Sequence, residues 1–232
     1  MFRDSAADFF ISIAYWTLRK IGGPFVRALL VKKVTGLHHI PKKGPAVIAF
    51  NHQSYFDFFC FLAVTPRNVH FLVAEKFFAS RLWRPLMKMT GQIHVDRNAK
   101  DKQPVHNAVH DNLRKGRIIG IFPEGTRAKS AQETEKAFTG AAKYAMESHA
   151  PIIPIGIKGT YDIMSRHDTK PHVRKIAEMH IGKPIHLEEY HTKKAGPEAH
   201  EEITHRLMLT ISRLSEKSYP HAPSHLVHFP HE

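Results

Sequence analysis

Three short apolar runs in this chain each end abruptly at a group of polar and charged residues. The runs span residues 46–50, 92–95 and 117–122, and the polar groups after them span residues 51–57, 96–97 and 123–127. Near-continuous apolar character is typical of strands that are covered on both faces of a sheet. In α/β sheets, ligands gather beyond the carboxyl ends of the strands. The pattern therefore predicts one sheet with one shared site along its edge.

Strand and helix patterns alternate along the rest of the chain, which indicates an α/β fold with a largely parallel or mixed central sheet flanked by helices. Further strands are expected at 69–74, 151–157 and 176–185, and helices at 58–64, 76–90, 105–114, 137–149 and 198–219. A length of 232 residues with 42% hydrophobic residues suits one domain with one core. We place this domain at residues 34–220, between N-terminal helices at 1–33 and a His- and Pro-rich tail at 221–232.

Two aromatic-rich apolar runs, at 9–18 and 25–31, precede the expected sheet. Neither reaches the roughly 20 apolar residues of a membrane-spanning helix, and neither has the features of a cleaved signal peptide. We expect two amphipathic helices joined by an elbow at Gly22-Gly23-Pro24, with their apolar faces in a bilayer interface. The residues expected to meet anionic headgroups are Arg19, Lys20, Arg27, Lys32 and Lys33. The alternative is that both helices pack only on the domain core.

The formal net charge of +13 predicts an acidic partner, which a nucleic acid, an anionic bilayer or a phosphorylated substrate would provide. The single cysteine, Cys60, excludes an intramolecular disulfide and reads as a small core residue in a reducing compartment. Combined with the apolar N-terminal runs, the charge favours an anionic membrane surface over nucleic acid. We therefore expect a peripheral or monotopic protein at the cytoplasmic face of a membrane.

His52 and Asp57 stand five positions apart, directly after the first apolar run. Five positions on a continuous helix correspond to a rotation of roughly 500°, so the two side chains would not meet there. A bend between strand and helix would join them, and both Asn51 and Ser54 favour such turns. A carboxylate bonded to one imidazole nitrogen fixes the tautomer and leaves the other nitrogen as a general base. The alternative is that the two residues only brace a loop.

Two other function classes are compatible with parts of the sequence. A metal-dependent hydrolase would use His52 and Asp57 as ligands, but no His-x-x-x-His spacing surrounds residue 52, and prolines interrupt the C-terminal histidines. Those histidines are His221, His225, His228 and His231. A non-catalytic protein that binds anionic lipid or nucleic acid is the other class. Ser54 lacks a surrounding Gly-x-Ser-x-Gly sequence, so we expect it to cap a turn rather than carry an acyl group.

Four ordered motifs between residues 34 and 160 resemble the glycerolipid acyltransferase family, and in particular the lysophosphatidic acid acyltransferases. Asn51, His52 and Asp57 match the first motif. Residues 91–97, ending in Asp96-Arg97, are similar to the second, residues 122–127 to the third and residues 150–155 to the fourth. A His-x4-Asp pair alone is a weak signal, whereas the four motifs in this order are specific.

The resemblance implies transfer of a fatty acyl group from a thioester, acyl-CoA or acyl-carrier protein, to the free hydroxyl of a lysophospholipid. The implied acceptor is 1-acyl-glycerol-3-phosphate, with another lysolipid or polar hydroxyl compound as the alternative. The resemblance also implies that His52 is the general base and that Asp57 is the carboxylate that orients it. It implies no metal and no cofactor besides the acyl donor. The implied substrate-binding residues are Lys76, Arg97, Glu124, Gly125, Thr126 and Arg127.

The chemistry of these residues supports the same roles. Arg97 and Arg127 carry forked donors that suit phosphate oxygens, and Gly125 allows the backbone to approach a ligand closely. Glu124 cannot bind an anion, so we expect it to position one of the arginines or to accept from a glycerol hydroxyl. The alternative for these charged residues is a structural ion-pair network. His94 is expected in the core, with a second catalytic histidine as the alternative.

Overall fold

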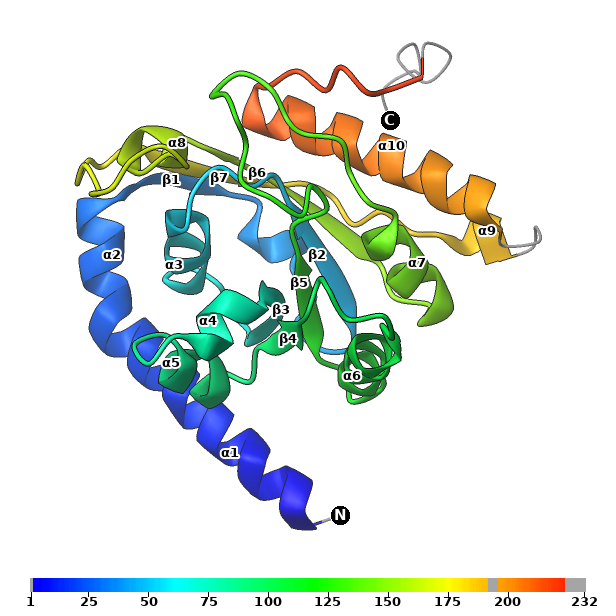
Figure 1. Ribbon diagram of the computed structural model, residues 1–232, viewed down its shortest axis with the longest axis horizontal. Helices are drawn as coiled ribbons and strands as arrows, with labels where there is room; N and C mark the ends of the chain where they lie inside the picture. The colour runs from blue at the N-terminus through cyan, green and yellow to red at the C-terminus, as the bar shows by residue number, and fades with distance from the viewer. Residues whose placement is uncertain (1, 192–195, 224–232) are drawn as a thin grey trace.

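A computed structural model describes residues 2–191 and 196–223, and its core is one mixed seven-stranded sheet in the order β1-β7-β6-β2-β5-β3-β4 (Figure 1). The five strands from β6 to β4 run parallel, whereas β7 pairs antiparallel with β6 and parallel with β1. The strands are β1 (Val31–Thr35), β2 (Ala46–Phe50), β3 (Val69–Ala74), β4 (Ile93–Val95), β5 (Ile118–Ile121), β6 (Ile152–Lys158) and β7 (Ala177–Ile181). The predicted α/β fold with a largely parallel or mixed sheet is confirmed.

Helices cover both faces of the sheet (Figure 1). One side carries α1 (Phe2–Thr17), α2 (Gly23–Leu29), α3 (Phe56–Leu62), α4 (Glu75–Ala79) and α5 (Arg84–Met89). The other carries α6 (Gln103–Arg114), α7 (Gly140–Glu147) and α10 (Pro197–Ser215). The short helices α8 (Thr160–Ile163) and α9 (Glu188–His191) complete the chain.

Side chains of β2 alternate between the two cores, as the period of a strand requires. Val47 and Ala49 join the core that includes α7 and α10, whereas Ile48 and Phe50 join the core that includes α3. All five residues of β2 are buried, which explains the uninterrupted apolar run in the sequence. Cys60 of α3 lies in the second core as predicted, and burial raises the pKa of its thiol to about 12.

The N-terminal segment differs from the prediction in two ways. The glycine pair does not break the helix, because Leu18–Gly22 is a π-helical turn that leads directly into α2 (Figure 1). Residues Val31–Thr35 form β1 instead of ending a helix, so the expected boundary after residue 33 falls inside a strand. Pairing with β7 at the sheet edge outweighs the local helical pattern, and Lys32 lies there 2.8 Å from Glu178.

Helix α1 packs on the domain through one face and exposes the other. The buried Tyr15 hydroxyl donates to Val69 O and accepts from Gln92 Nε2 at 3.1 Å. Arg19 donates to Asn68 Oδ1 at 3.0 Å, so it faces the protein and not, as predicted, the headgroups. An exposed set of residues, here named the apolar stripe, comprises Phe9, Phe10, Ile13, Trp16, Ile21, Phe25 and Leu29. Within the described ranges, no helix has the length and apolar character that crossing a bilayer requires.

Three predicted helices are shorter than expected. The run 76–90 divides into α4 and α5 because Ser80 adopts an extended backbone and Pro85 lies in the first turn of the second helix. The helix expected at 137–149 forms only over Gly140–Glu147, and α10 ends at Ser215. Of the predicted tail at 221–232, residues 224–232 lie outside the part of the chain that the structure describes.

Candidate active site

His52 and Asp57 meet in a turn between β2 and α3. His52 Nδ1 lies 2.8 Å from Asp57 Oδ2. Helix α3 begins only at Phe56, so the five positions between the pair do not form a continuous helix. The predicted bend is therefore present and brings the two side chains together. The imidazole stacks on the ring of Phe122, with 4.0 Å between ring centroids, and its side chain is 18% exposed.

Asp57 is fully buried and receives hydrogen bonds on both carboxylate oxygens. Oδ2 accepts from the backbone amides of Gln53 at 2.7 Å and Ser54 at 2.9 Å, in addition to His52. Oδ1 accepts from Thr160 Oγ1 at 2.5 Å. Donors on both oxygens hold the carboxylate in one orientation. That carboxylate fixes Nδ1 as the protonated nitrogen of a neutral imidazole and leaves Nε2 to accept a proton.

Two further side chains hold the turn in place. Asn51 binds the backbone of Ile157 in β6 through both amide atoms, each at 2.7 Å. Ser54 Oγ accepts from the Phe56 amide at 3.2 Å and donates to Met164 O at 2.6 Å. The capping role predicted for Ser54 is confirmed, and its hydroxyl proton points to a backbone carbonyl.

Glu124 braces the site from behind and does not contact the arginines, which corrects the prediction. One carboxylate oxygen accepts from the His52 amide and the other from the Glu135 amide, both at 2.7 Å. Glu124 is 3% exposed, and burial raises the pKa of its carboxyl to about 7 although both amide hydrogen bonds act in the opposite direction. The acidic side chain in this motif therefore joins two loops, because its oxygens are taken by backbone donors.

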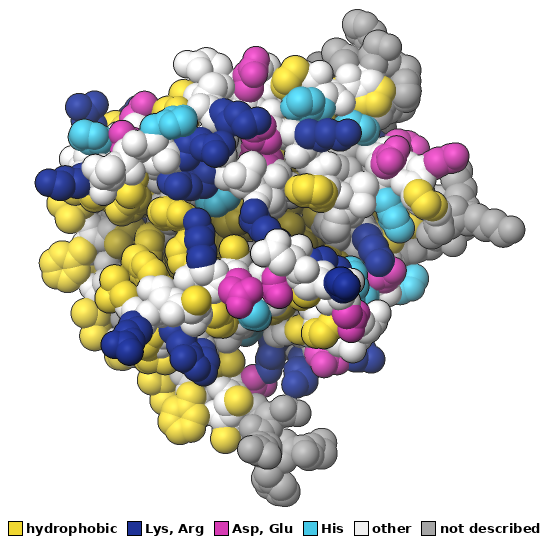
Figure 2. Space-filling view, viewed as in Figure 1, with side chains coloured by type: hydrophobic (Ala, Val, Ile, Leu, Met, Phe, Trp, Pro, Cys, Tyr) yellow, Lys and Arg dark blue, Asp and Glu magenta, His cyan; other side chains and the backbone are white. Residues whose placement is uncertain are grey.

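A cavity of about 1230 Å³ opens in front of His52. Its apolar wall reaches from α3 and α5 to α6, and includes Phe58, Phe59, Trp83, Met87 and Val105. Cationic side chains also line it, namely Lys76, Arg97, Lys102, Arg127 and Arg166. Figure 2 shows this face of the molecule, where Lys and Arg side chains surround a hollow with hydrophobic side chains inside. The cavity thus combines an apolar volume with positive charge near one imidazole.

The first group of cations gathers around Tyr55. The guanidinium carbon of Arg127 lies 3.9 Å from the centroid of the Tyr55 ring, and Nη1 donates to Ser165 O at 3.1 Å. Lys76 Nζ donates to the Tyr55 hydroxyl at 2.8 Å. Lys76 and Arg127, two of the predicted substrate-binding residues, therefore lie on the same tyrosine, and no pattern in the sequence marks Tyr55.

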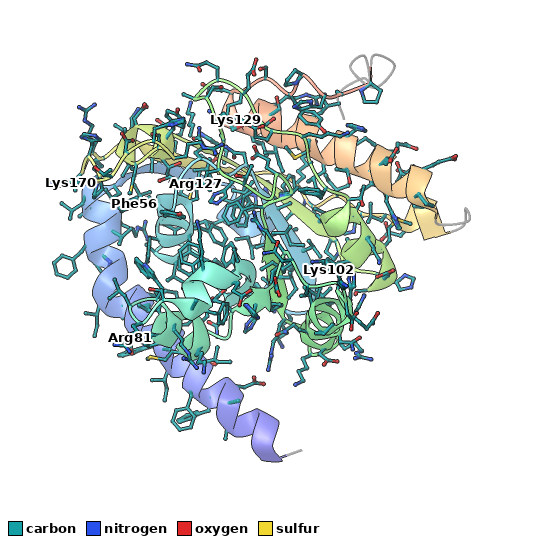
Figure 3. All side chains as sticks on the ribbon, in the orientation of Figure 1. Phe56, Arg81, Lys102, Arg127, Lys129 and Lys170 are labelled. Atoms are coloured by element: carbon teal, nitrogen blue, oxygen red, sulfur yellow. The ribbon has the colours of Figure 1, made fainter. Side chains whose placement is uncertain are left out.

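The second group lies on the other side of the third motif. Arg97 donates to Gly125 O, and Lys102 Nζ, at the start of α6, donates to Arg97 O at 2.7 Å (Figure 3). Gly125 has φ +64°, and a Cβ there would lie 2.9 Å from the Phe138 ring, so glycine is needed at this position. Thr126 is exposed and lines the cavity. Lys102 follows the second motif by five positions, and no pattern marked it in the sequence.

Two histidine predictions change. His94 is exposed and packs edge-on against Phe78, outside the cavity lining, so it is neither a core residue nor a second base. His221 contacts the ring of Tyr219, and the other three C-terminal histidines lie outside the described residues. Among residues 2–191 and 196–223, no group of three or more His, Cys, Asp or Glu side chains is arranged to hold a metal ion.

Known proteins share both the sequence pattern and the fold. The acyltransferase family model matches residues 32–158, which is more than half of the chain. The chain is 25% identical over 128 residues to 1-acyl-sn-glycerol-3-phosphate acyltransferase of Bacillus subtilis (strain 168), covering 55% of this chain and 62% of that protein. It is 28% identical over 184 residues to 1-acyl-sn-glycerol-3-phosphate acyltransferase alpha of Mus musculus, covering 78% of this chain and 63% of that protein.

A crystal structure has the same fold. It is that of the 1-acyl-sn-glycerophosphate (LPA) acyltransferase PlsC from Thermotoga maritima, with a TM-score of 0.70 and 18% identity over 93% of this chain and 84% of that one. The chain spans less than two thirds of the length of the two sequence relatives. The family match includes the turn that holds His52 and Asp57, together with Arg97, Arg127 and the motif on β6. The chain therefore belongs to the acyltransferase family.

Proposed function

We propose that this protein transfers a fatty acyl group from an acyl thioester to the free hydroxyl of 1-acyl-glycerol-3-phosphate, which forms phosphatidic acid in phospholipid biosynthesis. The observation that carries this proposal is the 2.8 Å contact between His52 Nδ1 and Asp57 Oδ2 at the wall of a cavity that is both apolar and cationic. The Bacillus subtilis and Mus musculus relatives are named as 1-acyl-sn-glycerol-3-phosphate acyltransferases, which supports the same acceptor.

The chemical step uses the His52 imidazole as the base. His52 Nε2 takes the hydroxyl proton as the acceptor oxygen bonds to the thioester carbonyl carbon. Collapse of the tetrahedral intermediate breaks the carbon–sulfur bond, and the His52 imidazolium donates its proton to the leaving sulfur, which departs as the free thiol. Asp57 stabilises the transient imidazolium, as the carboxylate does in other His-containing acyl transfer sites. General-base catalysis of this kind contributes about 10²–10⁴-fold.

The cationic side chains bind the phosphate of the acceptor. Arg127 and Arg97 offer planar forks for phosphate oxygens, and Lys76 adds a point charge beside Tyr55. Thr126 and the Gly125 backbone complete this wall of the cavity. The apolar wall accommodates acyl chain. Electrostatic binding of the phosphate fixes the glycerol hydroxyl near His52, and such positioning of two reactants lowers the barrier.

The donor is an acyl thioester, either acyl-CoA or acyl-carrier protein, and the step requires no other cofactor. The thiol is the leaving group, the hydroxyl is the nucleophile, and the proton moves through His52. A metal-dependent hydrolase would instead release a free fatty acid and depend on a bound cation.

Product analysis tests the proposal directly. The full chain is incubated with labelled acyl-CoA or acyl-carrier protein and with lysophosphatidic acid, a zwitterionic lysolipid or a neutral lysolipid. Labelled phosphatidic acid should form, with a higher kcat/KM for lysophosphatidic acid than for the other acceptors, and exhaustive chelation should leave the rate unchanged. Release of free fatty acid alone, or loss of activity on chelation, would contradict the proposal.

We also propose that the protein binds an anionic bilayer peripherally at its cytoplasmic face through the apolar stripe on α1 and α2. Trp16 is 58% and Phe25 68% exposed, which is unusual for aromatic side chains on a soluble surface. Beside α1, the segment before α5 exposes Leu82 together with Arg81 (Figure 3). Apolar side chains flanked by basic ones fit an interface with anionic headgroups.

Co-sedimentation with vesicles that contain anionic phospholipid tests this surface. The double variant Trp16→Ser and Phe25→Ser should bind about 10-fold or more weakly, since each buried aromatic side chain contributes about 1.5–3 kcal/mol. Val173→Ser, which changes an exposed apolar residue outside the stripe, should bind like the parent. These substitutions keep Tyr15 and β1, which deletion of residues 1–33 would remove. Undiminished binding of the double variant would contradict the proposal.

A further inference from the structure

Lys217 lies behind the His52–Asp57 pair, on the segment that follows α10. Its amide donates to Ser212 O at 2.9 Å, after Glu216 has reversed the chain with left-handed backbone angles. The next residue, Ser218, donates to Gln132 O at 2.9 Å. This segment is thereby fixed against the loop that follows the third motif.

The Lys217 side chain reaches Gln53, the residue next to His52. When the Gln53 amide nitrogen donates to Ile157 O at 3.1 Å, its carbonyl oxygen accepts from Lys217 Nζ at 2.5 Å. This orientation satisfies both amide atoms of a side chain that is almost fully buried. The Gln53 backbone amide donates to Asp57. Lys217 therefore holds the side chain of a residue whose backbone holds the catalytic carboxylate.

Three carboxylates act electrostatically on this ammonium group, namely Asp57 on α3, Glu124 after β5 and Asp162 on α8. Burial lowers the pKa of Lys217, and the charges of Glu124, Asp57 and Asp162 act against that shift. Asp57 and Glu124 are themselves buried. A buried carboxylate is costly unless a positive charge or hydrogen bonds compensate it, and Lys217 supplies such a charge from the rear of the site.

We propose that Lys217 is a positioning residue for acyl transfer, which fixes the catalytic turn through Gln53 and offsets the negative charge of Asp57 and Glu124. This role rests on the proposed function, because the reaction that Lys217 would assist is the proposed acyl transfer. Lys217 lies outside residues 32–158, so the segment after α10 would supply a functional group that the family motifs do not contain.

Lys217→Met tests the role because it keeps most of the side-chain volume and removes the charge. Removal of one positive charge should raise the pH midpoint at which the His52 imidazole resonances titrate in NMR spectra by about 0.5 pH unit. The other charged groups of this site are Asp57, Glu124, Asp162, Arg97 and Arg127, and the Glu124 carboxyl itself titrates, because burial raises its pKa to about 7. kcat should fall about 10-fold, with KM for donor and acceptor within about twofold of the parent, because Lys217 touches neither substrate. Lys217→Arg should recover most of the loss.

Lys183→Met is the matched control, since Lys183 is an exposed lysine after β7, and it should leave the midpoint and kcat unchanged. If Lys217→Met does not fold, Gln53→Met removes the same contact from its other partner and should lower kcat, whereas the His52 midpoint should stay close to that of the parent because the Lys217 charge remains. An unchanged His52 midpoint together with an unchanged kcat would overturn the role. The NMR titration needs no substrate, so a shifted midpoint in a protein without acyl transfer would refute the proposed function and keep the positioning role.

Discussion

The two sides of the cavity differ in how firmly their functional groups are held. On the side of the catalytic turn, Asp57 accepts hydrogen bonds from His52, Thr160 and two backbone amides. On the cationic side, within the described residues, Arg127 uses one of its five N–H donors in a protein hydrogen bond and otherwise rests on the Tyr55 ring. The proposed base is thus fixed before a ligand arrives, whereas the proposed anion site keeps donors for a phosphate. Preorganisation is concentrated where charge develops in the reaction.

The largest effect is expected from breaking the fixed side. His52→Ala should lower kcat by about 10³-fold, because the base is lost, and Asp57→Asn should have a comparable effect, because it changes the imidazole tautomer. Single-turnover measurements with saturating substrates isolate the chemical step. Ser54→Ala is the control and should retain activity within about threefold, since its hydroxyl only caps the turn. A loss in Ser54→Ala as large as in His52→Ala would refute direct attack and indicate an acyl-enzyme.

The next largest effect should come from the cationic side. Arg127→Gln should raise KM for lysophosphatidic acid by about 30-fold, because charge-assisted hydrogen bonds to phosphate contribute about 1.5–3 kcal/mol. KM for a neutral lysolipid should change much less. Arg174→Gln, at an exposed position before β7, provides the charge-matched control. Equal losses with anionic and neutral acceptors would show that Arg127 maintains structure and does not select the headgroup.

Glu124 connects the two sides, and its titration affects stability. Its folded-state pKa of about 7 lies above the ordinary 4.5, so the folded protein binds this proton more tightly than the unfolded chain. The free energy of unfolding should therefore fall as the pH rises from 4.5 to 7. Glu124→Gln should remove this contribution, and should cost about 1–3 kcal/mol because an amide cannot accept from both backbone donors.

Denaturant unfolding of parent and variant across that pH range measures both effects. Glu133→Gln, at an exposed site in the same loop, should keep the parental dependence on pH. An identical slope in parent and Glu124→Gln would contradict the assignment of the proton to Glu124.

The smallest effect is expected from Tyr55, which joins Arg127 and Lys76. Tyr55→Phe keeps the ring under Arg127 and removes only the hydroxyl, so KM for lysophosphatidic acid should rise about twofold to threefold. Tyr55→Leu also removes the ring and should raise it about 10-fold, in line with a cation–π contact of about 1–2 kcal/mol. Equal effects of the two variants would show that the hydroxyl, and not the ring, positions the cations.

The local pattern of apolar and polar residues was sufficient to predict the inner strands of the sheet and the turn that holds His52 and Asp57. The uninterrupted apolar run of β2 predicted a central strand, and the angle between positions 52 and 57 on a helix required the bend that the structure has. It failed at β1, because Val31–Thr35 becomes a strand only through pairing with β7, which lies far along the chain. The break between α4 and α5 was missed although Pro85 marks it.

Residues that support the site from a distance left no signal. Thr160 reaches Asp57 across 103 positions, and a lone threonine has no pattern that reveals such a partner. Glu124 was assigned to the arginines because charge suggested it, whereas burial and two backbone amides determine its contacts. The sequence alone shows what chemistry each side chain can perform, whereas the fold determines which groups that side chain contacts.

The hydrogen bonds of Tyr15 to β3 and Gln92 connect α1 rigidly to the strand beside the cavity. These buried bonds oppose a hinge between α1 and β3, so a membrane that binds α1 would be held at a set tilt relative to the turn of His52 and Asp57. A lipid would then enter the cavity at one angle and one depth. The length of its glycerol backbone, and not a movement of the protein, would determine which hydroxyl comes close to the His52 imidazole.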